Sequence, residues 1–379
     1  MAAVVNLGGL VDGWLQPIGI PGLDIYQRFT EWRLFADGIY PMHGVASSDE
    51  MALPHFRGSV YPPWVFPVFG LVFSWAGYEG GKAFVFAASL LALTLIAWIG
   101  YQYLAPLGPW AALMGALSPL AILGNRFCFS HGQFSIICMG LISTQWLLIA
   151  RKYCRTASIF WALAMIKPQI AFFFVWPLVR RGRWFALAMG CGTLVVLSVI
   201  TFVHTTSSPI ALWNQWASVL PLFVDSANSN LFAKAIGLMD RPVLVVAIAI
   251  VILVVSVFLL RRWPVVRAVK SRLRVEVDPM ISAAACAVIG YASVYHMLYD
   301  KIMLYPLVLV CLKGVIQRPR FQSCCMAVAI FAIVWLPERI LAVFPTVPGQ
   351  TLVLLVLGFC IMYRKDRLSH SLPDAGRVS

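Results

Sequence analysis

The sequence predicts an all-α integral membrane protein with many transmembrane helices, on three observations. Hydrophobic residues make up 61% of the chain and charged residues only 12%, whereas a soluble domain usually carries about 45–50% and about 25%. The apolar residues also come in long runs that are almost free of charge, and a helix of roughly 20 such residues crosses a bilayer. Barrel strands would instead alternate apolar and polar residues. The runs are 83–104, 183–203, 242–260, 279–294 and 350–363.

The formal net charge of +14 does not indicate nucleic-acid binding, because the basic residues form short clusters between the apolar runs. The positive-inside rule assigns such clusters to the cytoplasm. They are Arg151, Lys152 and Arg155; Arg180, Arg181 and Arg183; six residues within 261–274; Lys313, Arg318 and Arg320; and Arg364, Lys365 and Arg367. The other polar segments then lie outside, namely 24–59, 125–132, 205–241 and 295–301.

Counting helices against this layout predicts two broken segments. Segments 109–124 and 156–179 would each put a boundary on the wrong side if they were simple spans. Lys167-Pro168 lies in the middle of the second, and proline kinks a helix. Irregular backbone at membrane depth needs protein or a wet cavity around it, so both breaks indicate a polar cavity. The simple spans are 60–77, 82–104, 133–150, 183–204, 242–260, 279–297, 302–316, 323–343 and 350–363.

The chain is predicted to form a single transmembrane domain over residues 1–365, followed by a disordered cytoplasmic tail at 366–379. Residues 24–59 and 205–241 are its external loops, and the first is amphipathic, as interfacial segments are. The cysteines lie mostly in or beside apolar runs, without metal-ligand spacing, so we expect small buried residues rather than disulfides.

Several polar residues at the outer boundary or at membrane depth need an explanation. Lys167 lies inside an apolar run, where a charge costs a few kcal/mol and commonly has a function. The others each have an ordinary alternative, such as a helix cap, a capping pair or an interfacial belt of aromatic residues. They are His131 and Gln133, His296 and Asp300, and Asn228 and Asn230 in the second loop. All of these residues fall on the predicted external side or at membrane depth, which favours one shared site.

These residues form an ordered pattern: Asp24, Gly38-x-Tyr40, Tyr61-Pro62-Pro63, Gly132-Gln133, Lys167-Pro168, and His296 before Pro306. The pattern resembles glycosyltransferase family 87, whose members are integral membrane GT-C enzymes that use polyprenyl-phosphate sugars. Mannosyltransferases are the best-known members. The resemblance covers roughly Asp24 to Pro306 and implies a GT-C-like bundle of about 9–11 helices. It also implies a bacterial inner-membrane protein whose site faces the periplasm.

The resemblance implies roles for individual residues. Asp24, in the first external loop, would be the general base that removes a proton from the acceptor hydroxyl. The donor phosphate would be held by Lys167, His296, Arg57 and Gln133. Sugar and acceptor binding would fall to Tyr40, Tyr61, His131, Asn228, Asn230 and Asp300. The family resembles inverting enzymes, so a single displacement is expected. We expect no cofactor, although phosphates can recruit a divalent metal.

Two alternatives to this assignment stay open. A transporter or flippase of lipid-linked sugars would have related halves with paired broken helices, and a membrane scaffold would need no deep lysine. Within the enzyme reading, Asp37 and Asp49 compete with Asp24 as the base. GT-C enzymes carry a membrane helix directly before this acid, yet residues 1–23 make a poor span. We expect either a degenerate first helix or a true start further upstream.

Overall fold

The computed structural model describes residues 24–41, 59, 61–122, 124–180, 183–212, 214, 279–293, 298–317, 319 and 321–335. All regular structure in these ranges is helical, so the predicted all-α fold is confirmed. Several predicted features lie outside the described residues: 1–23, most of 205–241, the spans 242–260 and 350–363, and the tail 366–379.

The described helices follow one another along the chain with short connections. The α-helices are α2 Asp24–Ala36, α3 Phe66–Phe73, α4 Gly77–Leu104, α5 Pro109–Leu117, α6 Gly124–His131, α7 Ser135–Ala150, α8 Cys154–Ala164, α9 Pro168–Ala171, α10 Trp176–Arg180, α11 Trp184–His204, α16 Pro279–Ser293, α17 Tyr305–Gln317 and α18 Phe321–Trp335. The 3-10 helices are η3 Pro63–Val65, η4 Ala105–Leu107, η5 Ser118–Ala121, η6 Phe172–Val175 and η7 Leu298–Leu304.

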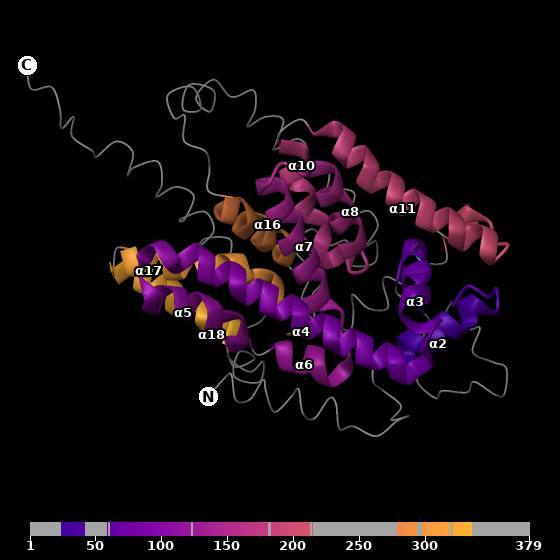
Figure 1. The fold of residues 1–379 in the computed structure, drawn as a ribbon, viewed down its shortest axis with the longest axis horizontal. Helices are drawn as coiled ribbons and strands as arrows, with labels where there is room; N and C mark the ends of the chain where they lie inside the picture. Colours follow the sequence, from indigo (N-terminus) through magenta and orange to yellow (C-terminus); the bar gives the residue numbers. More distant parts are fainter. Residues whose placement is uncertain are drawn as a thin grey trace, which may run out of the picture.

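Two described helices are long and apolar enough to cross a membrane, namely Gly77–Leu107, which joins α4 to η4, and Trp184–His204, which is α11. They are the two long ribbons in Figure 1 and match the predicted spans 82–104 and 183–204. Their outer surfaces carry exposed apolar side chains, including Leu91 and Val203, each with more than two thirds of its surface exposed. Such surfaces suit contact with lipid tails.

Both predicted breaks are present. Residues 109–121 and 124–131 pass the length and composition test only as a pair, and the two halves are bent by 54°. In the second segment α8 ends at Ala164, Lys167 has a non-helical backbone with a φ of −118° and a ψ of 86°, and α9 begins at Pro168. Proline disfavours helical conformation at the residue before it and fits the first helical position after it.

The predicted span over residues 60–77 is wrong. The helical piece there runs only from Pro63 to Phe73, which at about 1.5 Å per residue covers roughly half of the hydrocarbon thickness. Its Phe66, Phe69 and Phe73 side chains are fully buried in the protein rather than facing lipid. The apolar run therefore marks a core helix, a reading that hydrophobicity alone does not distinguish from a short span.

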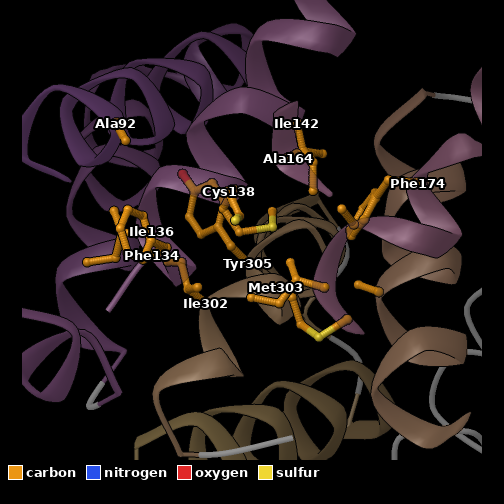
Figure 2. Packing of buried hydrophobic residues seen from close by; sticks show 14 of the residues in the cluster. Ala92, Phe134, Ile136, Cys138, Ile142, Ala164, Phe174, Ile302, Met303 and Tyr305 are labelled. Atoms are coloured by element: carbon orange, nitrogen blue, oxygen red, sulfur yellow. The ribbon is translucent and has the colours of Figure 1, made fainter. Parts of the chain in front are cut away.

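The core gathers side chains from the start, the middle and the end of the described chain. Figure 2 shows Phe134, Ile136 and Cys138, from the start of α7, packed with Ile302 and Met303 of η7. Tyr305 continues this core, and its hydroxyl donates to the carbonyl oxygens of Ile96 and Gly115, both at 3.1 Å. These contacts fix η7 against α6, α7 and α16. All described cysteines are free thiols, as predicted.

Helix α2 lies beside α3 at one end of α4 (Figure 1). Its inner face buries Ile25, Leu34 and Phe35. It ends in a Schellman turn, in which the Gly38 N–H donates to the Phe35 carbonyl and the Ile39 N–H to the Leu34 carbonyl, both at 2.9 Å. Gly38 has a φ of +77°, a conformation that glycine adopts at little energetic cost.

Candidate active site

Asp24, the predicted base, lies at the N-terminal end of α2 and is half-buried. The Gln133 amide nitrogen donates a hydrogen bond to the Asp24 carboxylate. Gln133 follows α6 and is itself buried. The structure thus brings together two predicted residues that are far apart in the sequence, and leaves the Asp24 carboxylate partly accessible.

Gly132 makes this contact possible. It follows the last residue of α6 with a φ of +69°, and the Gln133 N–H donates to the Cys128 carbonyl at 2.9 Å, which is a Schellman closure. A Cβ atom on Gly132 would lie 2.6 Å from the Cβ of Ile25, the residue after Asp24. Glycine therefore lets the end of α6 lie directly against the start of α2.

A second feature of α2 was not predicted: Arg28 and Glu31 form a buried ion pair. The Arg28 Nη1 atom lies 2.9 Å from the Glu31 Oε2 atom, and the two side chains are 5% and 0% exposed. The Arg28 guanidinium also lies over the Tyr61 ring, 4.4 Å from its centroid. Its Nε atom donates weakly to the Asp24 backbone carbonyl at 3.4 Å. Arg28 thus connects Asp24, Glu31 and Tyr61.

Burial raises the pKa of Glu31 from 4.5 to about 7. The charge of Arg28 and a hydrogen bond from Ser59 oppose this shift, while the nearby charge of Asp24 adds to it. Desolvation dominates because a carboxylate without water is costly even beside a cation. Glu31 is therefore poised to change its charge near neutral pH, a property that often marks functional sites.

Lys167, Ser135 and Asp300 form a second buried cluster. The Lys167 ammonium donates to the Ser135 hydroxyl at 2.8 Å and pairs with the Asp300 carboxylate at 3.2 Å. The Ser135 hydroxyl in turn donates to the same Asp300 oxygen at 2.7 Å. The Lys167 and Asp300 side chains are 3% and 0% exposed. The buried lysine is thus paired with a carboxylate from η7.

The helix break lets the Lys167 side chain point into the protein. Lys167 is the non-helical residue directly before α9, and its side chain is buried against Ser135 and Asp300. The Met165 carbonyl, freed by the break, accepts a hydrogen bond from the Trp64 indole N–H at 2.9 Å. Such replacement partners are what broken helices need at membrane depth. The break therefore has a structural function as well as placing the lysine.

Tyr61 is within electrostatic range of both clusters. Its phenol interacts electrostatically with Arg28, Lys167, Glu31 and Asp24. The chain segment from Gln133 to Ser135 bridges them as well, since Gln133 contacts Asp24 and Ser135 contacts Lys167. A half-buried acid, two buried cations and their two carboxylate partners therefore belong to one polar site within an apolar core.

The other predicted residues are placed differently. Tyr40 is buried, and its phenol interacts electrostatically with Glu31. Its ring packs edge-on against Phe66. His131 is half-buried, and its Nδ1 atom lies 2.9 Å from the Ser130 hydroxyl and 3.2 Å from the Phe127 carbonyl, both on its own helix. Four predicted residues lie outside the described part of the chain: Arg57, His296, Asn228 and Asn230, as does the competing acid Asp49. The other competing acid, Asp37, is exposed at the end of α2.

Sequence reasoning missed Arg28, Glu31 and Ser135. A signal for the first two was available, because Asp24, Arg28 and Glu31 are spaced four and three residues apart and share one helix face. That face also carries the buried apolar residues of α2. Charged residues on the apolar face of an amphipathic helix are unusual and need a buried partner. Ser135 gave no comparable signal.

A family comparison agrees with this arrangement. The model of glycosyltransferase family 87 matches residues 60–277, more than half of the chain. The chain belongs to glycosyltransferase family 87. This family 87 protein is therefore a glycosyltransferase and a membrane protein. No curated protein and no solved structure matches the chain.

The matched segment contains Tyr61, Gln133 and Lys167, but it begins after α2. The association of Asp24 with the family site therefore depends on the contact with Gln133 rather than on the family match. Among the described residues, no group of three or more His, Cys, Asp or Glu side chains is arranged to hold a metal ion.

Proposed function

We propose that this family 87 protein transfers a sugar, most simply a mannose-like hexose, from a polyprenyl-phosphate donor to an extracytoplasmic glycan or glycolipid. The observation that carries the proposal is the half-buried Asp24 carboxylate, held by Gln133 beside a site with two buried cations. A base needs partial access to the acceptor, and an anionic leaving group needs cations or hydrogen-bond donors. Both requirements are met within one site.

The proposed reaction is a single displacement with inversion at the anomeric carbon. The Asp24 carboxylate takes the proton of an acceptor hydroxyl as the hydroxyl oxygen forms a bond to the anomeric carbon. The bond between that carbon and the phosphate oxygen breaks, and its electron pair leaves with polyprenyl phosphate. No covalent sugar–enzyme intermediate forms, so one carboxylate is sufficient as the base.

Lys167 and Gln133 are the described candidates for stabilising the phosphate, with Arg57 and His296 as further candidates from the sequence. Tyr61 is proposed to face the sugar or the acceptor, because its phenol interacts electrostatically with both Asp24 and Lys167. Tyr40, His131, Asn228 and Asn230 remain candidates for the same role. Asp300 is better explained as the partner of Lys167, since its carboxylate is fully buried against that ammonium.

The test is a transfer assay with purified protein in lipid. Polyprenyl-phosphate sugars, mannose among them, are supplied with a crude membrane-lipid acceptor pool, and products are followed by mass spectrometry. We expect Asp24→Asn to lower the transfer rate by roughly 10²–10⁴-fold, the usual contribution of a general base, while donor binding is retained. Asp37→Asn is the matched control, because Asp37 is exposed directly after the same helix.

The two variants together decide the assignment. Transfer that survives Asp24→Asn and disappears with Asp37→Asn would move the base to the other end of α2. Donor binding without any transfer, by the wild type and with every donor and acceptor, would contradict the proposed reaction.

A further inference from the structure

Each buried cation of the site has its own buried carboxylate. Arg28 is paired with Glu31 at 2.9 Å, and Lys167 with Asp300 at 3.2 Å. All four side chains are at most 5% exposed. Both pairs act on the Tyr61 phenol from within the same site, Arg28 through direct stacking and Lys167 through its charge. Each of the two cations is therefore already paired with a carboxylate of the same chain.

A purely structural role does not explain the two ion pairs. Replacing a buried pair by apolar groups is often neutral or stabilising, so burial alone does not account for keeping two of them in an apolar core. The first pair reaches Asp24, because the Arg28 Nε atom donates to the Asp24 carbonyl oxygen. The second is held by Ser135, two residues after the Gln133 that contacts the Asp24 carboxylate. The anionic group of the proposed donor would bind in this region. A phosphate that enters this region meets cations that already hold an anion.

We infer that Glu31 and Asp300 are built-in counter-ions, which occupy the anion positions of the site when it is empty and give up Arg28 and Lys167 to the donor phosphate when it binds. This rests on the proposed polyprenyl-phosphate donor and adds Arg28 to its phosphate-binding groups. Ser135 helps the exchange at Lys167, because its hydroxyl contacts both the ammonium and the Asp300 carboxylate.

The inference has a consequence opposite to that of a structural role. A cation held by an internal carboxylate binds a ligand anion only in the fraction of molecules in which it is released, so the apparent affinity is reduced by that fraction. Removing the carboxylate's charge removes the competition. Glu31→Gln and Asp300→Asn should each bind polyprenyl phosphate more tightly than the wild type, by roughly tenfold, whereas loss of a structural pair would weaken binding.

Binding is measured on the purified full-length chain in lipid nanodiscs, with polyprenyl phosphate and with the neutral polyprenol of the same length. Asp37→Asn removes an exposed acid outside the site and is the matched control; it should bind as the wild type does. Arg28→Met and Lys167→Met should weaken binding of the phosphate and leave that of polyprenol unchanged. Thermal unfolding with and without ligand is recorded for every variant, and polyprenyl phosphate should stabilise Glu31→Gln and Asp300→Asn more than the wild type.

The outcomes separate this inference from the proposed function. Tighter phosphate binding by either carboxylate variant, with Asp37→Asn unchanged, supports it. Folded Glu31→Gln and Asp300→Asn proteins that bind phosphate equally or more weakly would overturn it, while the proposed donor would stand. A wild type that binds the phosphate no better than polyprenol would remove the proposed donor and this inference together. Should neither variant fold, the wild type is compared at about pH 6 and about pH 8, where Glu31 changes charge, and an unchanged affinity for a phosphodiester donor overturns the inference.

Discussion

At the scale of single residues, the behaviour of the site depends on how much more a buried unpaired charge costs in free energy than a buried ion pair. Removing one member of a buried ion pair typically costs about 3–5 kcal/mol, because the remaining charge loses its compensation. A ligand anion can restore that compensation for Arg28 or Lys167, but it cannot for Glu31 or Asp300. Substitutions of the cations and of the carboxylates should therefore have opposite effects on the affinity for an anionic donor.

Glu31 should make donor binding depend on pH. With its pKa raised to about 7 by burial, Glu31 is mainly neutral below that pH and mainly ionised above it. The ionised form holds Arg28, so affinity for a phosphodiester donor, whose own charge is constant in this range, should fall as pH rises through about 7. Glu31→Gln should show no such dependence, as measured by donor titrations from about pH 5.5 to 8.5.

Asp37→Asn is the control for this titration and should keep the wild-type dependence. The described charged or titratable groups around Glu31 are Arg28, Asp24, Tyr40 and Tyr61, with the Ser59 hydroxyl as a hydrogen-bond partner. Burial and the Glu31 charge raise the pKa of Tyr40, so this phenol stays neutral throughout the titrated range. A dependence that persists in Glu31→Gln would assign the ionisation to another group.

The residues that could be predicted from the sequence are those whose chemistry conflicts with their surroundings. Lys167 was noticed because a lysine in an apolar run is energetically costly. Asp24 and Gly132-Gln133 were noticed because they occur in the order that family 87 shows along its chain. Which carboxylate pairs with Lys167 could not be predicted, because Asp300 follows it by more than a hundred residues and only the packing of η7 brings them together. Glu31 was missed because a charged residue in a helix is normally expected to face solvent, unless the buried face of the helix is known.

At the scale of elements, the site depends on where helices stop. Gly38 ends α2 and Gly132 follows α6, each with a positive φ, and Pro168 starts α9. These three residues determine the directions in which Tyr40, Gln133 and Lys167 leave their helices. Breaks of this kind are readable from sequence, since glycine and proline act locally. Whether an apolar helix spans the membrane cannot be predicted in this way, as the short helix over Pro63–Phe73 demonstrates.

Gly132→Ala should damage the site more than a comparable change at another glycine. An alanine there adopts a left-handed conformation at a cost of about 1–2 kcal/mol, and its Cβ atom would also press on Ile25. The start of α2 must then move away, which breaks the contact between Asp24 and Gln133. We expect the transfer rate to fall by roughly tenfold or more, with a lowered melting temperature.

Gly77→Ala is the matched control. Gly77 also has a positive φ, of +61°, but a Cβ atom there would meet nothing within 4 Å. This variant should lose a similar increment of stability from backbone strain while keeping its transfer rate. Equal loss of activity in both variants would show that strain in general, rather than the approach of α6 to α2, limits the reaction.

At the scale of the whole molecule, helix α7 relates the site to the membrane. It begins at Ser135, in the Lys167 cluster, and ends at Ala150, directly before the exposed basic residues Arg151 and Lys152. Its 16 residues span about 24 Å, which approaches the thickness of the hydrocarbon core. We therefore expect the site and the basic turn to lie near opposite membrane surfaces, with the basic turn on the cytoplasmic side by the positive-inside rule.

This relation predicts an external site, which can be tested by labelling introduced thiols. Asp37→Cys places a thiol at the exposed end of α2, near the site, and Arg151→Cys places one in the basic turn. In intact cells, a membrane-impermeant maleimide should label Asp37→Cys, and Arg151→Cys should react only after permeabilisation. The unsubstituted chain sets the baseline, because Cys191 and Cys325 are exposed. The reverse pattern would put Asp24 on the cytoplasmic side, where an extracytoplasmic acceptor could not reach it.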